Sequence, residues 1–192
     1  MQVKFKVKRF NPEIDSKPHW GEYDVEIEPT DRVLDGLDYI KWNLDSSLTY
    51  RKSCAHGICG SDALVINGRN RLACKLLMKQ ALAESQVISV EPLRGLPVVK
   101  DLVVDMDGFF AKYKSVKPYL INHDPEPEKE RFQSAKDHAR FDYTTPCILC
   151  AACTTSCPTF WADKEYVGPA VLVQAHRFIF DSRDQGGEER LA

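Results

Sequence analysis

Hydrophobic and polar residues alternate at the N-terminus, which predicts a β-strand with one buried face. Val3, Phe5 and Val7 would point into a core, while the lysines between them would face solvent. Residues 22–28 alternate in the same way, with acidic residues in the polar positions. Because basic and acidic side chains on paired strands attract each other, the two segments predict an antiparallel hairpin.

A helix and further strands follow this hairpin. From Asp31, a candidate N-cap, the pattern changes to helical spacing and predicts an amphipathic helix that covers the sheet. Residues 63–66 and 71–74 flank Asn67-Gly68, a dipeptide typical of tight hairpin turns, and residues 87–90 form another candidate strand. The apolar positions of the helix are Val33, Leu34, Leu37 and Ile40.

The remainder of the chain predicts a mainly helical second domain. Residues 102–113 have a helical pattern, whereas residues 124–131 combine proline with charge and predict an exposed loop. Pro169 can occupy the first turn of an apolar-striped helix, and Gly186-Gly187 is expected to end the last helix. The expected organisation is α+β, with domains at residues 1–103 and 104–192.

The composition and charge of the chain exclude several classes of function. The chain has 192 residues, 43% hydrophobic and 28% charged, as in folded globular proteins. A net charge of −2 gives no field that would gather nucleic acid, so no nucleic-acid partner is expected. The N-terminus lacks the apolar core of a signal peptide. The longest apolar run, residues 147–153, is far too short to span a bilayer.

The first of two cysteine groups has the spacing of a 2Fe-2S site. Cys54 and Cys59 are separated by four residues, Asp62 stands where a third cysteine is usual, and Cys74 follows at a distance. A carboxylate can ligate ferric iron, and Gly57 suits a loop that wraps a cluster. The alternatives are that Asp62 only stabilises a turn, and that the three cysteines bind zinc or stay as thiols.

The second group reads C-x2-C-x2-C-x3-C-P and comprises Cys147, Cys150, Cys153 and Cys157. In two-cluster ferredoxins the first three cysteines of this motif hold one cubane and the fourth ligates another. Both sites would then need further ligands, from a longer chain or from ligands not identified in the sequence. A closed zinc site is the alternative, although ten residues make a cramped span for it.

Taken together, these motifs resemble the iron-sulfur subunit of succinate dehydrogenase and fumarate reductase along essentially the whole chain. The resemblance implies a β-grasp, plant-ferredoxin-like domain followed by a helical, bacterial-ferredoxin-like domain. Its specific matches are residues 53–54, 57–62, 67–68, 72–74, 92–97, 101–105, 147–150, 156–158, 168–170, 177–178 and 181–184.

The resemblance also implies the cofactors. A 2Fe-2S cluster is expected on Cys54, Cys59, Asp62 and Cys74. A 4Fe-4S cluster would use Cys147, Cys150 and Cys153, and a 3Fe-4S cluster would use Cys157. Since the family's remaining cubane ligands lie in a C-terminal stretch not found here, truncation after Ala192 is expected.

By the same resemblance, the chain would carry electrons from a flavoprotein (FAD) subunit that oxidises succinate to a membrane quinone. It would lie peripherally on the cytoplasmic face of the inner membrane, held by membrane-anchor subunits. Pro158, Thr159 and Trp161 would border the quinone. Ala162, where many members have a second tryptophan, and Ala55-His56, where many have Arg-Glu, are departures that would alter the quinone pocket and the charge beside the first cluster.

Other functions stay open at this point. The same subunit could operate as a fumarate reductase. From different classes, the chain could be a free-standing ferredoxin or a zinc-stabilised binding module. Analysis for iron and acid-labile sulfide would separate a cluster from zinc.

Overall fold

The computed structural model describes residues 1–191 and divides into two compact units. Unit 1 comprises residues 1–105 and 148–156, and unit 2 comprises residues 106–147 and those from 157 onward. The boundary that the sequence suggests between residues 103 and 104 stays a prediction. Segment 148–156 is distant in sequence from the rest of unit 1 but packs with it.

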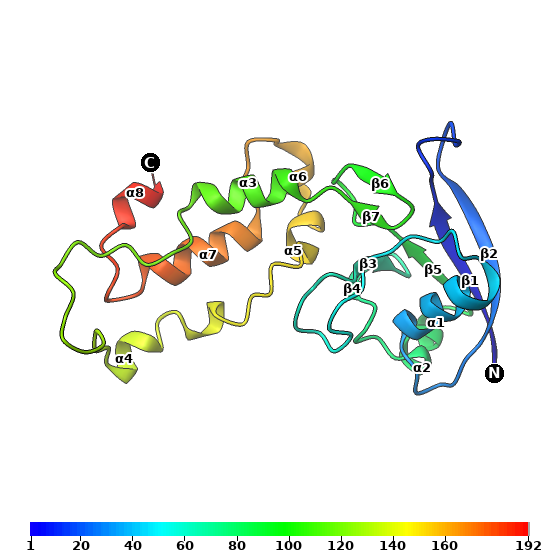
Figure 1. The fold of residues 1–192 in the computed structure, drawn as a ribbon, viewed down its shortest axis with the longest axis horizontal. Coiled ribbons are helices and arrows are strands. Elements are labelled where there is room, and N and C mark those ends of the chain that lie inside the picture. Colours follow the sequence, from blue (N-terminus) through cyan, green and yellow to red (C-terminus); the bar gives the residue numbers. More distant parts are fainter. Residues whose placement is uncertain (192) are drawn as a thin grey trace. The chain divides into compact units, whose positions relative to one another are not determined.

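Unit 1 is built on a five-stranded sheet of order β2-β1-β5-β3-β4 (Figure 1). Strands β1 and β5 pair in parallel and the other neighbours pair antiparallel. A small hairpin, β6 with β7, stands apart from it. The strands are β1 (Gln2–Arg9), β2 (His19–Glu26), β3 (Ala63–Ile66), β4 (Arg69–Leu72), β5 (Val87–Glu91), β6 (Val98–Lys100) and β7 (Val103–Val104).

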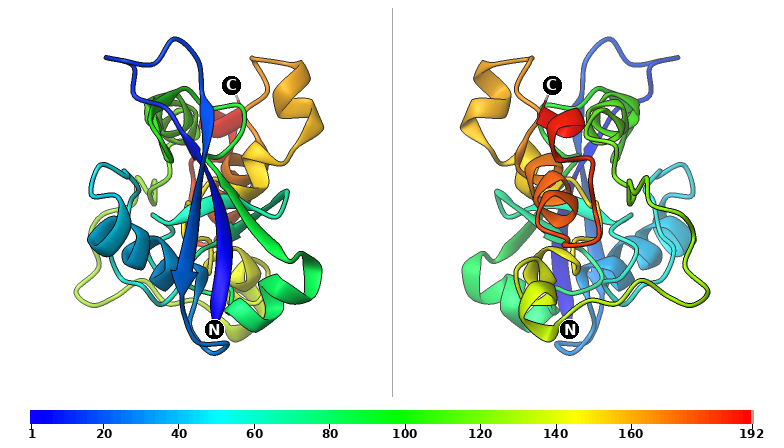
Figure 2. Two further views of the ribbon diagram at one scale, coloured as in Figure 1. Left: turned by 90° about the vertical axis from the view of Figure 1, so that its right-hand side faces the viewer. Right: turned by 90° about the vertical axis from the view of Figure 1, so that its left-hand side faces the viewer.

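The predicted antiparallel hairpin at the N-terminus is confirmed, although its second strand, β2, covers residues 19–26 and not 22–28. Lys4 pairs with Asp24 and Lys6 with Glu22 across β1 and β2, and their charged atoms lie 3.2 and 3.4 Å apart. The alternate residues of β1 are buried, as the pattern required. The two strands twist around each other, which is visible in the side views of Figure 2.

Two helices complete the core of unit 1, α1 (Val33–Tyr39) and α2 (Met78–Glu84). Helix α1 passes into one π-helical turn, η1 (Ile40–Leu44). It lies so close to the sheet that a Cβ on Gly36 would be 2.3 Å from the Phe5 ring. The N-cap position belongs to Arg32 and not to the predicted Asp31, because the Arg32 backbone N–H donates to the Asp35 carboxylate within the helix.

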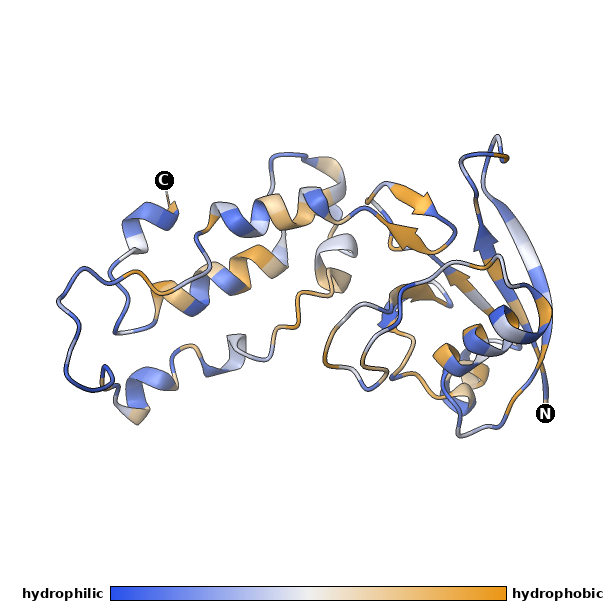
Figure 3. Cartoon of the chain, in the orientation of Figure 1, coloured by the Kyte–Doolittle hydropathy of each residue, from blue (hydrophilic) through white to orange (hydrophobic). Residues whose placement is uncertain are grey.

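Unit 2 is helical, as the sequence predicted for this part of the chain. A small core of Val116, Val171 and Ala175 joins α3 to α7. Figure 3 shows the apolar residues of α7 and the hydrophilic loop that precedes α4. The helices of unit 2 are α3 (Asp107–Ser115), α4 (Ala135–His138), η2 (Asp142–Thr144), α6 (Pro158–Ala162), α7 (Pro169–Ile179) and α8 (Gly187–Leu191), whereas α5 (Ala152–Thr155) belongs to unit 1.

Three further boundaries differ from the sequence-based expectation. The helix expected over residues 102–113 begins only at Asp107, because Val103 and Val104 pair with β6. Strand β4 occupies residues 69–72 and not 71–74, since it starts directly after the turn. Gly187 starts α8 and does not end the last helix. No helix within residues 1–191 is long and apolar enough to cross a membrane.

Arg9 anchors a buried polar network in unit 1. Its guanidinium donates to Asp101 at 2.9 Å, to the Tyr23 hydroxyl at 2.5 Å and to Asp45. Burial alone would lower the pKa of Arg9, but hydrogen bonds to Asp101 and Asp45 raise it above its usual value. Asp101 also accepts the backbone N–H groups of Phe10 and Thr49, so this network ties β1 and β2 to later loops.

We expect Arg9→Ala to lower the free energy of unfolding by about 3–5 kcal/mol, because Asp101 is 2% exposed and loses its counter-charge. Lys4→Ala is the matched control, since it breaks only the exposed pair with Asp24 and should cost under about 1 kcal/mol. Urea unfolding of the three proteins measures both values. Equal losses for the two variants would contradict the role assigned to Arg9.

Candidate iron-sulfur site

The first cysteine group surrounds one loop of unit 1. Cys54 and Cys59 lie in the loop before β3, Asp62 directly precedes that strand, and Cys74 follows β4. Cys74 and Asp62 are buried, at 0% and 3% exposure, whereas Cys59 is exposed. None of the seven cysteines, all within residues 1–191, forms a disulfide.

The loop turns its backbone N–H groups toward the sulfur of Cys54. His56, Ile58 and Cys59 donate to Cys54 Sγ at 3.5, 3.4 and 3.3 Å. This curvature depends on left-handed backbone angles, with φ of +57° at Ala55 and +87° at Gly57. The hydrogen bonds, first that from His56, lower the pKa of the Cys54 thiol to about 5. The loop therefore favours a thiolate at this position.

Asp62 has one carboxylate oxygen bonded and one without a hydrogen-bond partner. The backbone N–H of Cys74 donates to Asp62 Oδ2 at 2.5 Å, whereas Oδ1 is buried without a partner among the described residues. Burial, together with the Asp62 carboxylate, raises the pKa of the Cys74 thiol to about 12. The Oδ2 bond is what a turn-stabilising aspartate would make, but that role leaves Oδ1 unexplained. Such an oxygen is costly unless something else, such as a metal ion, satisfies it.

The donor set fits a two-iron cluster. Three cysteine sulfurs and one carboxylate supply four anionic donors, and each iron of such a cluster takes two of them. Within residues 1–191, no three His, Cys, Asp or Glu side chains are close enough together to hold a single metal ion. That the four side chains ligate a cluster stays a prediction, for which the orphaned Asp62 Oδ1 is the structural support.

The second cysteine group is divided between the two units. Cys150 and Cys153 lie in segment 148–156 of unit 1, whereas Cys147 and Cys157 belong to unit 2. Within segment 148–156, Leu149 and Ala151 have left-handed φ angles of +55° and +61°. This is the backbone of a tightly wound loop.

The two cysteine loops meet within unit 1 at Gly60. A Cβ on Gly60 would lie 2.6 Å from the Cβ of Cys150 and 3.0 Å from its Cα. Gly60 also has a left-handed φ of +70°. Its lack of a side chain therefore permits both the turn and the close approach, which sequence spacing alone could not indicate.

The expected quinone residues lie on α6 in unit 2. Pro158 occupies the first turn of this helix, and the Trp161 side chain is 48% exposed. Lys112 on α3 holds the segment that follows, because its ammonium group donates to the backbone carbonyls of Lys164 and Tyr166. Contact with a quinone stays a prediction.

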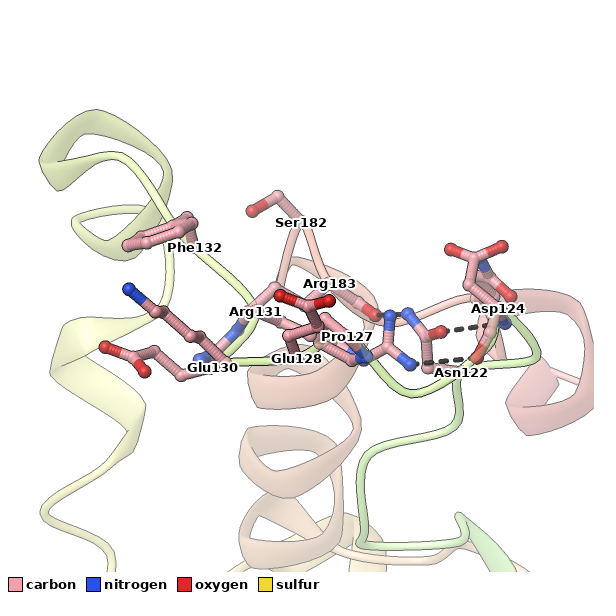
Figure 4. A pocket seen from close by; sticks show the side chains of 11 residues that line it. Asn122, Asp124, Pro127, Glu128, Glu130, Arg131, Phe132, Ser182 and Arg183 are labelled. Carbon is pink, nitrogen blue, oxygen red and sulfur yellow. Dashed lines mark hydrogen bonds between the residues drawn. The ribbon is translucent and has the colours of Figure 1, made fainter.

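A cavity of about 520 Å³ elsewhere in unit 2 contains none of the expected site residues (Figure 4). It lies between residues 122–132 and residues 182–185. Arg131 crosses it to donate to the Asp124 carbonyl. Glu128 and Lys129 line it with opposite charges, so the lining favours neither anions nor cations.

Comparisons with known proteins show the family to which the chain belongs. Residues 4–111 match the family described as a 2Fe-2S iron-sulfur cluster binding domain. The succinate dehydrogenase iron-sulfur subunit of Coxiella burnetii is 42% identical over 97% of this chain and 79% of that protein. The mitochondrial succinate dehydrogenase [ubiquinone] iron-sulfur subunit of Candida glabrata is 48% identical over 97% of this chain and 74% of that protein.

A solved structure, the Mycobacterium smegmatis Sdh1 complex in the apo form, contains a chain of the same fold. The TM-score is 0.82 at 29% identity, covering 96% of this chain and 78% of the other. The fold and the first loop thus define a protein with a 2Fe-2S cluster-binding domain. More particularly, the chain belongs to the family of succinate dehydrogenase iron-sulfur subunits. The predicted α+β fold and electron-transfer subunit are confirmed.

The contact at Gly60 predicts unequal costs for two alanine substitutions. Gly68→Ala places a Cβ in open space at φ +77° and should cost about 1–2 kcal/mol of unfolding free energy. Gly60→Ala has a similar φ but meets the Cys150 backbone, so it should cost about 1–3 kcal/mol more. Denaturant unfolding of both variants gives the comparison, and equal costs would show that the contact is not tight.

Proposed function

We propose that this chain carries electrons from a flavoprotein (FAD) subunit that oxidises succinate to fumarate toward a membrane quinone. Cys54, Cys59, Asp62 and Cys74 hold a 2Fe-2S cluster at the start of this route. The observation that carries the proposal is Asp62 Oδ1, which is buried beside Cys74, has no hydrogen-bond partner within residues 1–191 and lies in a loop with the spacing of this cluster type. When bound, the cluster supplies transfer of one electron at a time.

The protein's own residues set the conditions for that chemistry. Three N–H groups stabilise negative charge on the Cys54 sulfur, while Cys74 and Asp62 exclude water by their burial. Hydrogen bonds to sulfur, net charge and solvent exposure are the factors through which a protein sets a cluster's potential. One exposed ligand, Cys59, leaves this side of the site accessible.

The second cysteine group would serve two further clusters. Cys147, Cys150 and Cys153 would provide three ligands of a 4Fe-4S cluster, and Cys157 would provide one ligand of a 3Fe-4S cluster. The C-x2-C-x2-C-x3-C-P spacing supports this division, because its fourth cysteine serves a different cluster in two-cluster ferredoxins. The two domains, residues 1–103 and 104–192, would thus carry different cluster types.

The proposed partners follow from membership of the family. The chain would assemble with the flavoprotein subunit and with membrane-anchor subunits, and lie peripherally on the cytoplasmic face of the inner membrane. Pro158, Thr159 and Trp161 would border the quinone. The exposed Trp161 side chain on α6 supports a contact there.

Substitution of Asp62 tests the ligand assignment. Asp62→Cys should keep a two-iron centre, because a thiolate is a softer and stronger donor to iron than a carboxylate. Asp62→Ala should lose most of it, since it leaves only three donors. Visible and electron paramagnetic resonance (EPR) spectra of the reduced proteins report the centre. Normal assembly in Asp62→Ala together with failure in Asp62→Cys would exclude Asp62 as a ligand.

Metal analysis tests the cofactor class. Protein produced anaerobically should contain iron and acid-labile sulfide in nearly equal amounts, because 2Fe-2S and 4Fe-4S centres hold equal numbers of each and a 3Fe-4S centre holds slightly more sulfide than iron. Chelation of the iron should abolish the visible spectrum. Zinc without sulfide would refute the proposed function. The cysteines would then indicate a zinc-stabilised binding module.

A further inference from the structure

Segment 148–156, here named the Cys150 loop, packs with the N-terminal sheet despite its place in the sequence. It contains Cys150, Cys153 and the short helix α5. Ala151 and Thr155 within it are each 1% exposed. The loop is therefore seated in unit 1, and specific contacts must hold it there.

One side chain of the sheet makes a two-point contact with this loop. The amide nitrogen of Asn70, on β4, donates to the Ala152 carbonyl at 2.9 Å and to the Thr155 hydroxyl at 2.7 Å. The Thr155 hydroxyl in turn donates to the Ala151 carbonyl at 2.9 Å. Both amide hydrogens of Asn70 are thus used on oxygen acceptors. An aspartate of the same shape could not donate either bond.

A second contact limits how closely the Cys150 loop approaches the first cysteine loop. Gly60, in the first cysteine loop, touches the Cys150 backbone and leaves no room for a Cβ. Asn70 holds the loop at α5, and Gly60 sets its approach at Cys150. Gly60 precedes β3 in the chain, and Asn70 lies on β4, which pairs with β3.

We infer that Asn70 is a positioning residue that fixes the Cys150 loop against the first cysteine loop. This inference rests on the proposed function, in which the two loops carry successive clusters. The positions of Cys150 and Cys153 relative to the first cysteine loop would then be set within unit 1, by Asn70, Thr155 and Gly60. Because electron transfer slows steeply with distance, a looser loop would weaken the connection without removing any cluster ligand.

Hydrogen exchange of the full chain tests the docking directly. Asn70→Ala should make the amides of residues 148–156 exchange about tenfold faster, because both hydrogen bonds to the loop are lost. Asn43→Ala is the matched control, since Asn43 donates only to the Tyr39 carbonyl in the same unit. Unchanged exchange in Asn70→Ala, or an equal rise in Asn43→Ala, would overturn the inference.

A pair of variants at Thr155 checks the acceptor. Thr155→Val keeps the shape but removes the oxygen that accepts from Asn70 and donates to the Ala151 carbonyl, so it should also accelerate exchange in the loop. Thr155→Ser keeps that oxygen and should retain slow exchange. If serine and valine behave alike, Asn70 does not act through this hydroxyl and the inference is wrong in that respect.

The spacing itself is tested in the assembled complex by EPR. Microwave-power saturation of the reduced 2Fe-2S signal reports a neighbouring paramagnetic centre, so Asn70→Ala should make the signal saturate at lower power while its amplitude stays constant. Unchanged saturation would overturn the positioning role. Absence of any cluster in the complex would instead refute the proposed function, and the exchange result would still decide whether Asn70 docks the loop.

Discussion

The proposed iron-sulfur site concentrates negative charge in a small volume, and the first cysteine loop is arranged to stabilise that charge. Three backbone N–H groups converge on the sulfur of Cys54 because Ala55 and Gly57 adopt left-handed angles. Asp62 adds a carboxylate whose second oxygen has no protein partner among the described residues. Asp62 directly precedes β3 and Cys74 follows β4, so the pairing of these two strands holds the two proposed ligands together.

Much of the fold could be predicted from the sequence, because the decisive patterns are local. The alternation in residues 3–7, the turn at Asn67 and Gly68 and the proline that opens α7 each report on their own neighbourhood. The start of α3 could not be predicted, since Val103 and Val104 are drawn into a strand pair by residues 98–100. Tertiary pairing outweighed helical spacing at that point.

The candidate site also combines a local sequence pattern, which could be predicted, with contacts between distant residues, which could not. The spacing of Cys54, Cys59 and Asp62 indicated the cluster type, and the hydrogen bonds to Cys54 agree with the glycine-rich loop. Nothing in the sequence singled out Asn70 as a positioning residue, because an asparagine in a short strand usually has no special role. Its contact with Thr155 spans 85 positions, and only the folded chain brings the two together.

Seating the Cys150 loop on the N-terminal sheet also has a consequence for biogenesis. Ribosomes release a chain from its amino end, so β4 can form before residues 148–156 have been translated. The folded sheet can then bind the Cys150 loop as this loop emerges from the ribosome. If the second cysteine group binds clusters as proposed, their insertion would then follow folding of the N-terminal sheet.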